Sequence, residues 1–375
     1  MEIEPTRVIS KATNLVSVER LGLIGLPNSG KSSLFNALTG GSAVVAQHPF
    51  STTETLTGVA IVPDKRLDAL SDMSKSKKTV YAHVEFVDIA GLVAGANAGE
   101  GLGNRFLAGI REVDALCMVL RAFADENVQG ETDPVEALGI LELELVMADL
   151  TTCESLVERR RKSARTDKSA ASEVEALEKA IAVLTSGTPI YKSDLADDTR
   201  EILKGSFLLT NKAVLIVVNL GEDQLDESEQ ICNTIREAAG GSIDVLGVCV
   251  QLESEAMALP QDEREELLAG LGLGEGALPR VAQAAYHMLG RRTFFTTGDK
   301  ESRAWTFRAG AKAPECAGVI HSDLQRGFIR AEVIHWDELL EIGSWTAAKN
   351  QGKLGVEGKD YEVKDGDVLE IRFNV

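Results

Sequence analysis

The chain has 375 residues, of which 44% are apolar and 26% charged, a balance typical of a globular protein. It contains no apolar run of about 18 residues, so the sequence predicts no membrane-spanning helix. The formal net charge of −19 disfavours binding to DNA and to bulk nucleic acid. Because residues 291–375 carry a net charge of only −1, the sequence predicts a separate C-terminal domain with its own partner.

The first 19 residues contain Glu2, Glu4 and Glu19 and no apolar stretch. They match neither a secretory signal nor a transit peptide, so we interpret 1–19 as a flexible extension. The five cysteines are scattered, and no pair has the spacing of a zinc or redox site. An odd number at such spacing favours reduced thiols and a cytoplasmic location.

Six short apolar runs predict buried strands, and helical patterns fall between them. Most of the runs are nearly continuous rather than alternating, as in a parallel sheet that helices cover on both faces. The pattern predicts an α/β fold with a mostly parallel, doubly wound sheet. The runs are 21–25, 58–62, 84–88, 115–120, 213–218 and 245–250.

The strongest motif is the segment GLPNSGKS at 25–32, which follows a predicted strand and opens a predicted helix. It matches the P-loop pattern G-x-x-x-x-G-K-[ST], whose main-chain N–H groups surround phosphates. Gly30 permits close approach of the main chain, Lys31 reaches the β- and γ-phosphates, and the Ser32 hydroxyl is suited to bind Mg²⁺.

A second motif, DIAG at 88–91, follows the strand predicted at 84–88. Asp88 can hold Mg²⁺ through water, and the Gly91 N–H can donate to a γ-phosphate. The next residue, Leu92, cannot polarise a water molecule. Hydrolysis therefore uses another group or is slow.

The segment 49–55 lies between these motifs, where the first switch loop of a GTPase-like domain belongs. A threonine there could complete the Mg²⁺ shell, but spacing does not choose among Thr52, Thr53 and Thr55. His48 precedes this loop, and it is either an acid or base in hydrolysis or a solvated histidine.

Residues 134–186 show helical spacing of apolar residues and no proline after Pro134, which predicts an inserted hairpin of two long helices joined near 163–172. The tip of the hairpin is basic, so it is either a solvated turn or a finger that contacts phosphates. Its cations are Arg159, Arg160, Arg161, Lys162, Arg165 and Lys168.

Guanine-specific domains carry N-K-x-D after a buried strand, but this chain has NLGE at 219–222. Asn219 keeps its place, Leu220 replaces the lysine, and Glu222 replaces the aspartate. The longer carboxylate does not fit the same pairing position, and main-chain groups near Leu220 are suited to adenine. We therefore expect a preference for ATP over GTP.

After residue 290 the sequence predicts a compact α+β module of short strands. The strands are expected at 292–296, 303–308, 328–334, 361–363 and 368–372.

Together these segments resemble the Obg-like ATPase family, also called YchF, over roughly residues 20–375. The resemblance rests on LGLIGLPNSGKSSLFNALT and EFVDIAGLVAGANAGEGLGNRFLAGIRE, and on the N-x-x-E at 219–222. It also rests on RAWTFRAGAKAPECAGVIHSDLQRGFIRAEVI and GKDYEVKDGDV near the C-terminus.

The resemblance implies an ATP-hydrolysing G-domain, a helical hairpin insertion and a C-terminal TGS domain of β-grasp fold. It further implies Mg²⁺ as cofactor and association with the ribosome. Magnesium would meet Ser32 and Thr52, because PFST at 49–52 aligns with the family's P-F-C-T, and the base would meet Leu220. The phosphates would meet Asn28, Ser29, Gly30, Lys31, Ser32 and Ser33.

Two departures from the family bear on its chemistry. Ser51 stands where the family often has cysteine, which puts a redox response at that position in doubt. The loop at 125–131 lacks the histidine that the family commonly carries there, and Gln129 is a candidate to orient water instead.

We therefore expect a flexible extension at 1–19, a G-domain at 20–290 with a hairpin at about 134–200, and a TGS domain at 291–375. The expected protein is a cytoplasmic, monomeric ATPase that binds ribosomal RNA on a large-subunit or 70S-type particle. One alternative is a GTP-hydrolysing ribosome-assembly factor. The other is a nucleotide-switched ribosome-binding or RNA-binding module whose hydrolysis is incidental.

Overall fold

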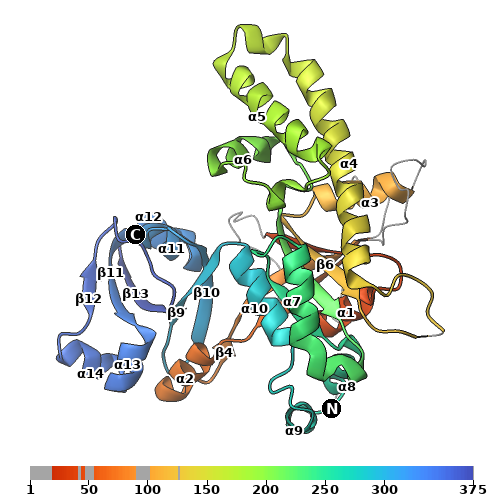
Figure 1. The fold of residues 1–375 in the computed structure, drawn as a ribbon. Helices are drawn as coiled ribbons and strands as arrows, with labels where there is room; N and C mark the ends of the chain where they lie inside the picture. Colours follow the sequence, from red (N-terminus) through yellow and green to blue (C-terminus); the bar gives the residue numbers. More distant parts are fainter. Residues whose placement is uncertain (1–18, 41–43, 47–54, 90–101, 126, 375) are drawn as a thin grey trace. The chain divides into compact units, whose positions relative to one another are not determined.

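A computed structural model describes residues 19–40, 44–46, 55–89, 102–125 and 127–374 of the chain (Figure 1). The chain divides into two compact units, each made of segments distant in sequence. The larger unit comprises Glu19–Pro63 and His83–Gly290, and the smaller includes Asp64–Ala82 and Arg291–Val375.

A seven-stranded sheet forms the centre of the larger unit. Its strands are β1 (Arg20–Ile24), β2 (Val44–Ala46), β3 (Thr55–Val62), β5 (Ala82–Asp88), β6 (Ala115–Arg121), β7 (Ala213–Asn219) and β8 (Val245–Val248). The order across the sheet is β2-β3-β5-β1-β6-β7-β8. β5, β1, β6, β7 and β8 run parallel, whereas β2 is antiparallel to β3. The predicted mostly parallel sheet is confirmed.

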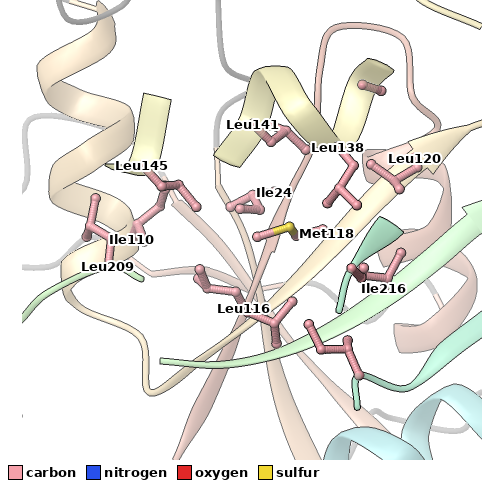
Figure 2. Close-up of a cluster of buried hydrophobic side chains, with 14 of the residues drawn as sticks. Ile24, Ile110, Leu116, Met118, Leu120, Leu138, Leu141, Leu145, Leu209 and Ile216 are labelled. Carbon is pink, nitrogen blue, oxygen red and sulfur yellow. The ribbon is translucent and has the colours of Figure 1, made fainter. Parts of the chain in front are cut away.

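Helices cover this sheet, because successive strand residues point to opposite faces and both faces are apolar. Outside the insertion between β6 and β7, the helices among the described residues of the larger unit are α1 (Lys31–Thr39), α3 (Leu102–Arg111), α7 (Ser228–Ala238), α8 (Val250–Met257), α9 (Gln261–Gly270) and α10 (Leu278–Met288). Figure 2 shows Leu116, Met118 and Leu120 of β6 packed among side chains from α3 and the first turns of the hairpin, in a core that also includes residues of α7. α1 and α10 both contact β3, and α10 also contacts β7.

The predicted helical hairpin is present between β6 and β7. It consists of α4 (Pro134–Arg160) and α5 (Lys168–Thr185), joined by a single 3-10 turn at Ser163–Arg165 and followed by α6 (Asp197–Leu203). Asp133 caps α4 by accepting from the Val135 N–H at 2.8 Å. The hairpin has an apolar core of its own, which Leu177 and Leu203 share with Cys153.

A buried carboxylate fixes α4 to the chain that leads into β7. Asp149 accepts hydrogen bonds from the main-chain N–H groups of Leu209 (2.8 Å) and Thr210 (2.7 Å) and from the Thr210 hydroxyl (2.7 Å). Burial raises the pKa of Asp149, although these three hydrogen bonds act in the opposite direction. The hydrogen bonds therefore position the hairpin on the larger unit.

The smaller unit is built on a mixed six-stranded sheet. Its strands are β4 (Thr79–Val80), β9 (Arg291–Thr296), β10 (Ser302–Arg308), β11 (Phe328–His335), β12 (Gly355–Glu357) and β13 (Asp367–Phe373), in the order β12-β11-β13-β9-β10-β4. Its helices are α2 (Lys65–Ser74), α11 (Ala313–Ile320), α12 (Ser322–Arg326), α13 (Trp336–Ile342) and α14 (Trp345–Asn350). The sheet with α11 packed on it is the α+β module that the sequence predicted.

The smaller unit differs from the sequence-based boundary at one end. The segment 64–82, placed by sequence in the G-domain, belongs to this unit because β4 pairs with β10 through Thr79 and Ser302. Arg66 of α2 strengthens the association by pairing with Asp365 at 2.7 Å and by lying 5.2 Å above the Phe295 ring.

The prediction of a strand at 361–363 is wrong. Glu362 forms one isolated bridge with Lys312, in which the Ala313 N–H donates to the Tyr361 carbonyl oxygen at 2.8 Å and the Val363 N–H donates to the Ala311 carbonyl oxygen at 3.0 Å. The segment runs beside a loop rather than beside another strand, so no ladder extends from it.

Candidate nucleotide-binding site

The P-loop motif forms the turn between β1 and α1. Asn28 (φ 63°) and Gly30 (φ 87°) both have left-handed main-chain conformations, which turn the chain sharply into the helix. Gly30 is the N-cap of α1 and has no side chain to cap the helix, and the first turn contains no acidic residue. The free N–H groups and the helix dipole at this end favour an anion.

Glycine is required at two positions of this loop. A Cβ atom on Gly30 would lie 2.1 Å from Nδ2 of Asn219, and one on Gly25 would lie 2.7 Å from the Val119 carbonyl oxygen. The Ser29 hydroxyl is buried and has no hydrogen-bond partner in the described part of the chain. A buried polar atom without a partner at such a turn is suited to a bound anion.

The structure brings Lys31, Ser32 and Asp88 together, as the sequence predicted from two separate motifs. Lys31 Nζ forms an ion pair with Asp88, and the side chains are 9% and 8% exposed. Ser32 Oγ donates to Asp88 Oδ2 at 2.8 Å. A hydroxyl and a carboxylate side by side offer the oxygen ligands that Mg²⁺ prefers. Ser33, on the next position of α1, is exposed.

Asn219, expected in the base site, holds the P-loop. Its Nδ2 donates to the Ser29 carbonyl oxygen at 3.1 Å, and its Oδ1 accepts from the Val250 N–H at 3.2 Å. The side chain therefore connects the end of β7 to the P-loop and to the start of α8.

The two other residues of the N-x-x-E segment differ in exposure. Leu220 is buried and donates its N–H to the Val248 carbonyl oxygen at 2.9 Å, whereas Glu222 is exposed at the start of a 3-10 helix. Gly221 donates its N–H to the Gln224 side chain at 2.9 Å. Both N–H groups are thus used within the protein, so a base here would meet acceptors or apolar surface.

Sequence reasoning missed the contact between the P-loop and the loop that precedes α4. Asn28 Nδ2 donates to the Gln129 carbonyl oxygen at 3.0 Å, so the main chain of Gln129 adjoins the P-loop while its side chain is exposed. Arg121 holds the same loop by donating to the Val128 carbonyl oxygen. The only sequence signal for this contact was the presence of a charged residue at the end of an apolar strand.

Several predicted residues lie outside the described part of the chain. These are Thr52, with Ser51 and His48 of the same loop, and Gly91 with Leu92. Ser32 and Asp88 are the predicted Mg²⁺ ligands that the described residues contain.

The fold and the loop define a P-loop nucleotide-binding domain of the GTPase class. Residues 20–147 match a family described as "50S ribosome-binding GTPase", and residues 292–374 match the family YchF-GTPase_C, described as a protein of unknown function.

Relatives extend this similarity to the whole chain. The chain is 45% identical over 361 residues to the "Ribosome-binding ATPase YchF" of Bacillus subtilis, covering 94% of this chain and 99% of that protein. The protein of the same name from Pasteurella multocida is 45% identical over 95% of this chain and 99% of its own length. The structure of the Schizosaccharomyces pombe YchF GTPase is 32% identical, with a TM-score of 0.82 over 96% of this chain and 99% of that one. The chain belongs to the YchF family.

The contact at Gly30 gives a test of the P-loop geometry. Gly30→Ala places a methyl group where Asn219 lies, so we expect nucleoside triphosphate affinity to fall by about tenfold or more. The left-handed main chain at this position also makes alanine about 1–2 kcal/mol less favourable than glycine, which lowers the stability of the fold. Gly40→Ala is the matched control, because Gly40 also has a positive φ (59°) but no atom of the described residues is found within 4 Å of its Cβ position. Thermal unfolding and nucleotide titration of both variants check this. Equal affinities in the two variants would contradict it.

Proposed function

We propose that this protein is a Mg²⁺-dependent ATPase that associates with the ribosome. The observation that carries the proposal is the convergence of Lys31, Ser32 and Asp88 at the N-terminus of α1. Relatives covering nearly the whole chain are named ribosome-binding ATPases, which supports the same assignment. We also propose a cytoplasmic monomer. The five cysteines are free and buried, in keeping with a reducing compartment.

Lys31 and the N–H groups of the P-loop would hold the β- and γ-phosphates, and Ser32 with Asp88 would hold the metal ion. Bound Mg²⁺ would neutralise charge on the phosphate oxygens. Phosphoryl transfer depends chiefly on position and charge, so these residues suffice for slow turnover. Orienting the attacking water requires a further residue. Gln129 is a candidate because its main chain adjoins the P-loop.

The names of the relatives differ on the base, since two bacterial proteins are called ATPases and the fission yeast structure a GTPase. ATP is favoured here because the aspartate that pairs with guanine is replaced by Glu222, which is exposed at the start of a 3-10 helix. A GTP-hydrolysing ribosome-assembly factor is the second candidate, supported by the name of the N-terminal family.

The tip of the hairpin supports contact with ribosomal RNA. Its six cations, defined above as 159–162, 165 and 168, are all exposed. Arg160 pairs with Glu173 at 3.3 Å and Arg161 with Glu178 at 3.7 Å, whereas Lys162, Arg165 and Lys168 form no ion pair within the described ranges. Cations without protein partners, on a body that is otherwise acidic, are suited to phosphates.

No helix in the described ranges is long and apolar enough to cross a membrane.

The Lys31 ammonium gives the most direct test of hydrolysis. Lys31→Ala removes the charge beside the phosphates, so we expect phosphate release from ATP to fall by about 100-fold or more. Steady-state phosphate release checks this, with Lys65→Ala as the control lysine outside the P-loop. Unchanged release in Lys31→Ala would show that the activity lies elsewhere.

The preference for ATP is tested by titration with ATP, GTP and their non-hydrolysable analogues. We expect ATP to bind about tenfold more tightly, the effect of one missing charge-assisted hydrogen-bonded pair. Glu222→Gln is expected to leave the weak GTP affinity unchanged, because the exposed carboxylate does not pair with guanine. The GTPase alternative would be favoured if the wild type bound ATP and GTP with comparable affinity and Glu222→Gln lost its affinity for GTP.

The hairpin tip is tested by sedimentation with ribosomes over a range of salt concentrations. Lys162→Glu with Lys168→Glu is expected to weaken binding and to lower the slope of log affinity against log salt by about 1.5. Lys179→Glu with Lys204→Glu is the control, because it changes the net charge equally at exposed lysines that form local ion pairs on α5 and at the end of α6. Equal losses in both double variants would exclude a specific role for the tip. Binding that ignores ATP would exclude a nucleotide switch.

A further inference from the structure

A buried arginine lies at the end of β6, beside the P-loop. Arg121 is 2% exposed. Its Nε donates to the Phe123 carbonyl oxygen at 2.9 Å, and its Nη1 donates to the Val128 carbonyl oxygen at 3.1 Å. The guanidinium carbon is 4.4 Å from the centroid of the Phe123 ring. One side chain thus holds both ends of the loop 123–128.

In the part of the chain that the structure describes, no carboxylate neutralises the charge of this arginine. Its Nη2 is buried and forms no hydrogen bond with the residues that the structure describes. A buried cation without a carboxylate costs stability, and Met or Leu would fill the same space without that cost. The reason for an arginine at this position therefore lies in its contacts with the loop 123–128.

The loop held by Arg121 touches the P-loop. The Gln129 carbonyl oxygen accepts from Asn28 Nδ2 at 3.0 Å, and a Cβ atom on Gly130 would lie 3.2 Å from the Pro27 carbonyl oxygen. This side of the loop therefore packs directly against the turn that precedes α1.

The start of the same loop touches the N-x-x-E segment. Phe123 Cβ lies 3.4 Å from the Cβ position of Gly221, and Gln224 Nε2 donates to the Ala122 carbonyl oxygen at 3.0 Å. The loop consequently connects the two segments proposed to bind the phosphates and the base.

We propose that Arg121 is a positioning residue for the nucleotide, which holds the loop 123–130 against both the P-loop and the N-x-x-E segment. The proposal rests on the proposed function. Arginine suits this role better than lysine, because its planar fork reaches two carbonyl oxygens while its face stacks on an aromatic ring. Arg121 acts through the loop that it holds, so we expect it to affect nucleotide binding rather than the chemical step.

The test uses the full chain with the substitutions Arg121→Met and Arg121→Lys and measures ATP affinity by titration. Arg121→Met is expected to weaken affinity about tenfold and to raise KM with kcat nearly unchanged. Arg121→Lys is expected to recover part of the affinity, to about threefold below wild type, because one ammonium group cannot serve both carbonyl oxygens and the ring.

Asp149→Asn is the matched control. It disturbs a buried hydrogen-bonded group of the same unit, so we expect it to lower the unfolding temperature while leaving ATP affinity and KM unchanged. The same loss of affinity in Asp149→Asn would overturn the proposal by showing a general effect of reduced stability. So would wild-type affinity in a folded Arg121→Met.

If Arg121→Met does not fold, Arg121→Lys decides alone, and wild-type ATP affinity and KM in that variant overturn the proposal. Wild-type ATP affinity in the Arg121 variants would overturn only the role of Arg121 and would leave the proposed function intact. A wild type that binds no ATP would overturn both.

Discussion

The side chain of Asn219 is the contact on which the nucleotide site depends. It fills the space left by the missing Cβ of Gly30, donates to the Ser29 carbonyl oxygen and accepts from the Val250 N–H. Three segments far apart in sequence meet at this one amide. The left-handed conformations of Asn28 and Gly30 are costly for an isolated loop, and contacts of this kind maintain them in the folded chain.

Several groups of the nucleotide site lie, like Asn219, at the ends of parallel strands along one edge of the sheet. Gly25 follows β1, Asp88 ends β5, Arg121 ends β6 and Asn219 ends β7, so the parallel strands deliver these groups to one edge. This is where open α/β sheets bind ligands, because helix N-termini and the loops after the strands lie there together. Main-chain groups in these loops cannot join the sheet, and side chains satisfy them instead.

Much of this could be predicted because the signals are local. The strands β1, β6 and β7 are continuous apolar runs, α4 and α5 have helical spacing, and the P-loop is a contiguous motif. Lys31 and Asp88 were also assigned to one site from motif order alone, and the structure places them in contact.

The rest depends on contacts that no local pattern records. The pairing of Thr79 with Ser302 joins segments more than two hundred residues apart, so the boundary of the smaller unit was misplaced. Asn219 was assigned to the base from its motif, although its hydrogen bonds go to the P-loop, a choice that only the packing decides. Arg121 gave no signal beyond its position, because its partners are main-chain carbonyl oxygens, which any residue type supplies.

The attachment of α4 has a mechanical consequence. The helix begins at Pro134, a few residues after the loop that touches the P-loop, and Asp149 fixes it to the chain before β7. At 1.5 Å per residue, Asp149 lies about 22 Å from one end of α4 and about 16 Å from the other. Leu138, Leu141 and Leu145 also hold the first turns of α4 in the core of the larger unit, so the helix is fixed along this stretch and not at a single point. The part of the hairpin beyond Asp149 is therefore a rigid arm, and its tip moves together with the core that lies beneath α4.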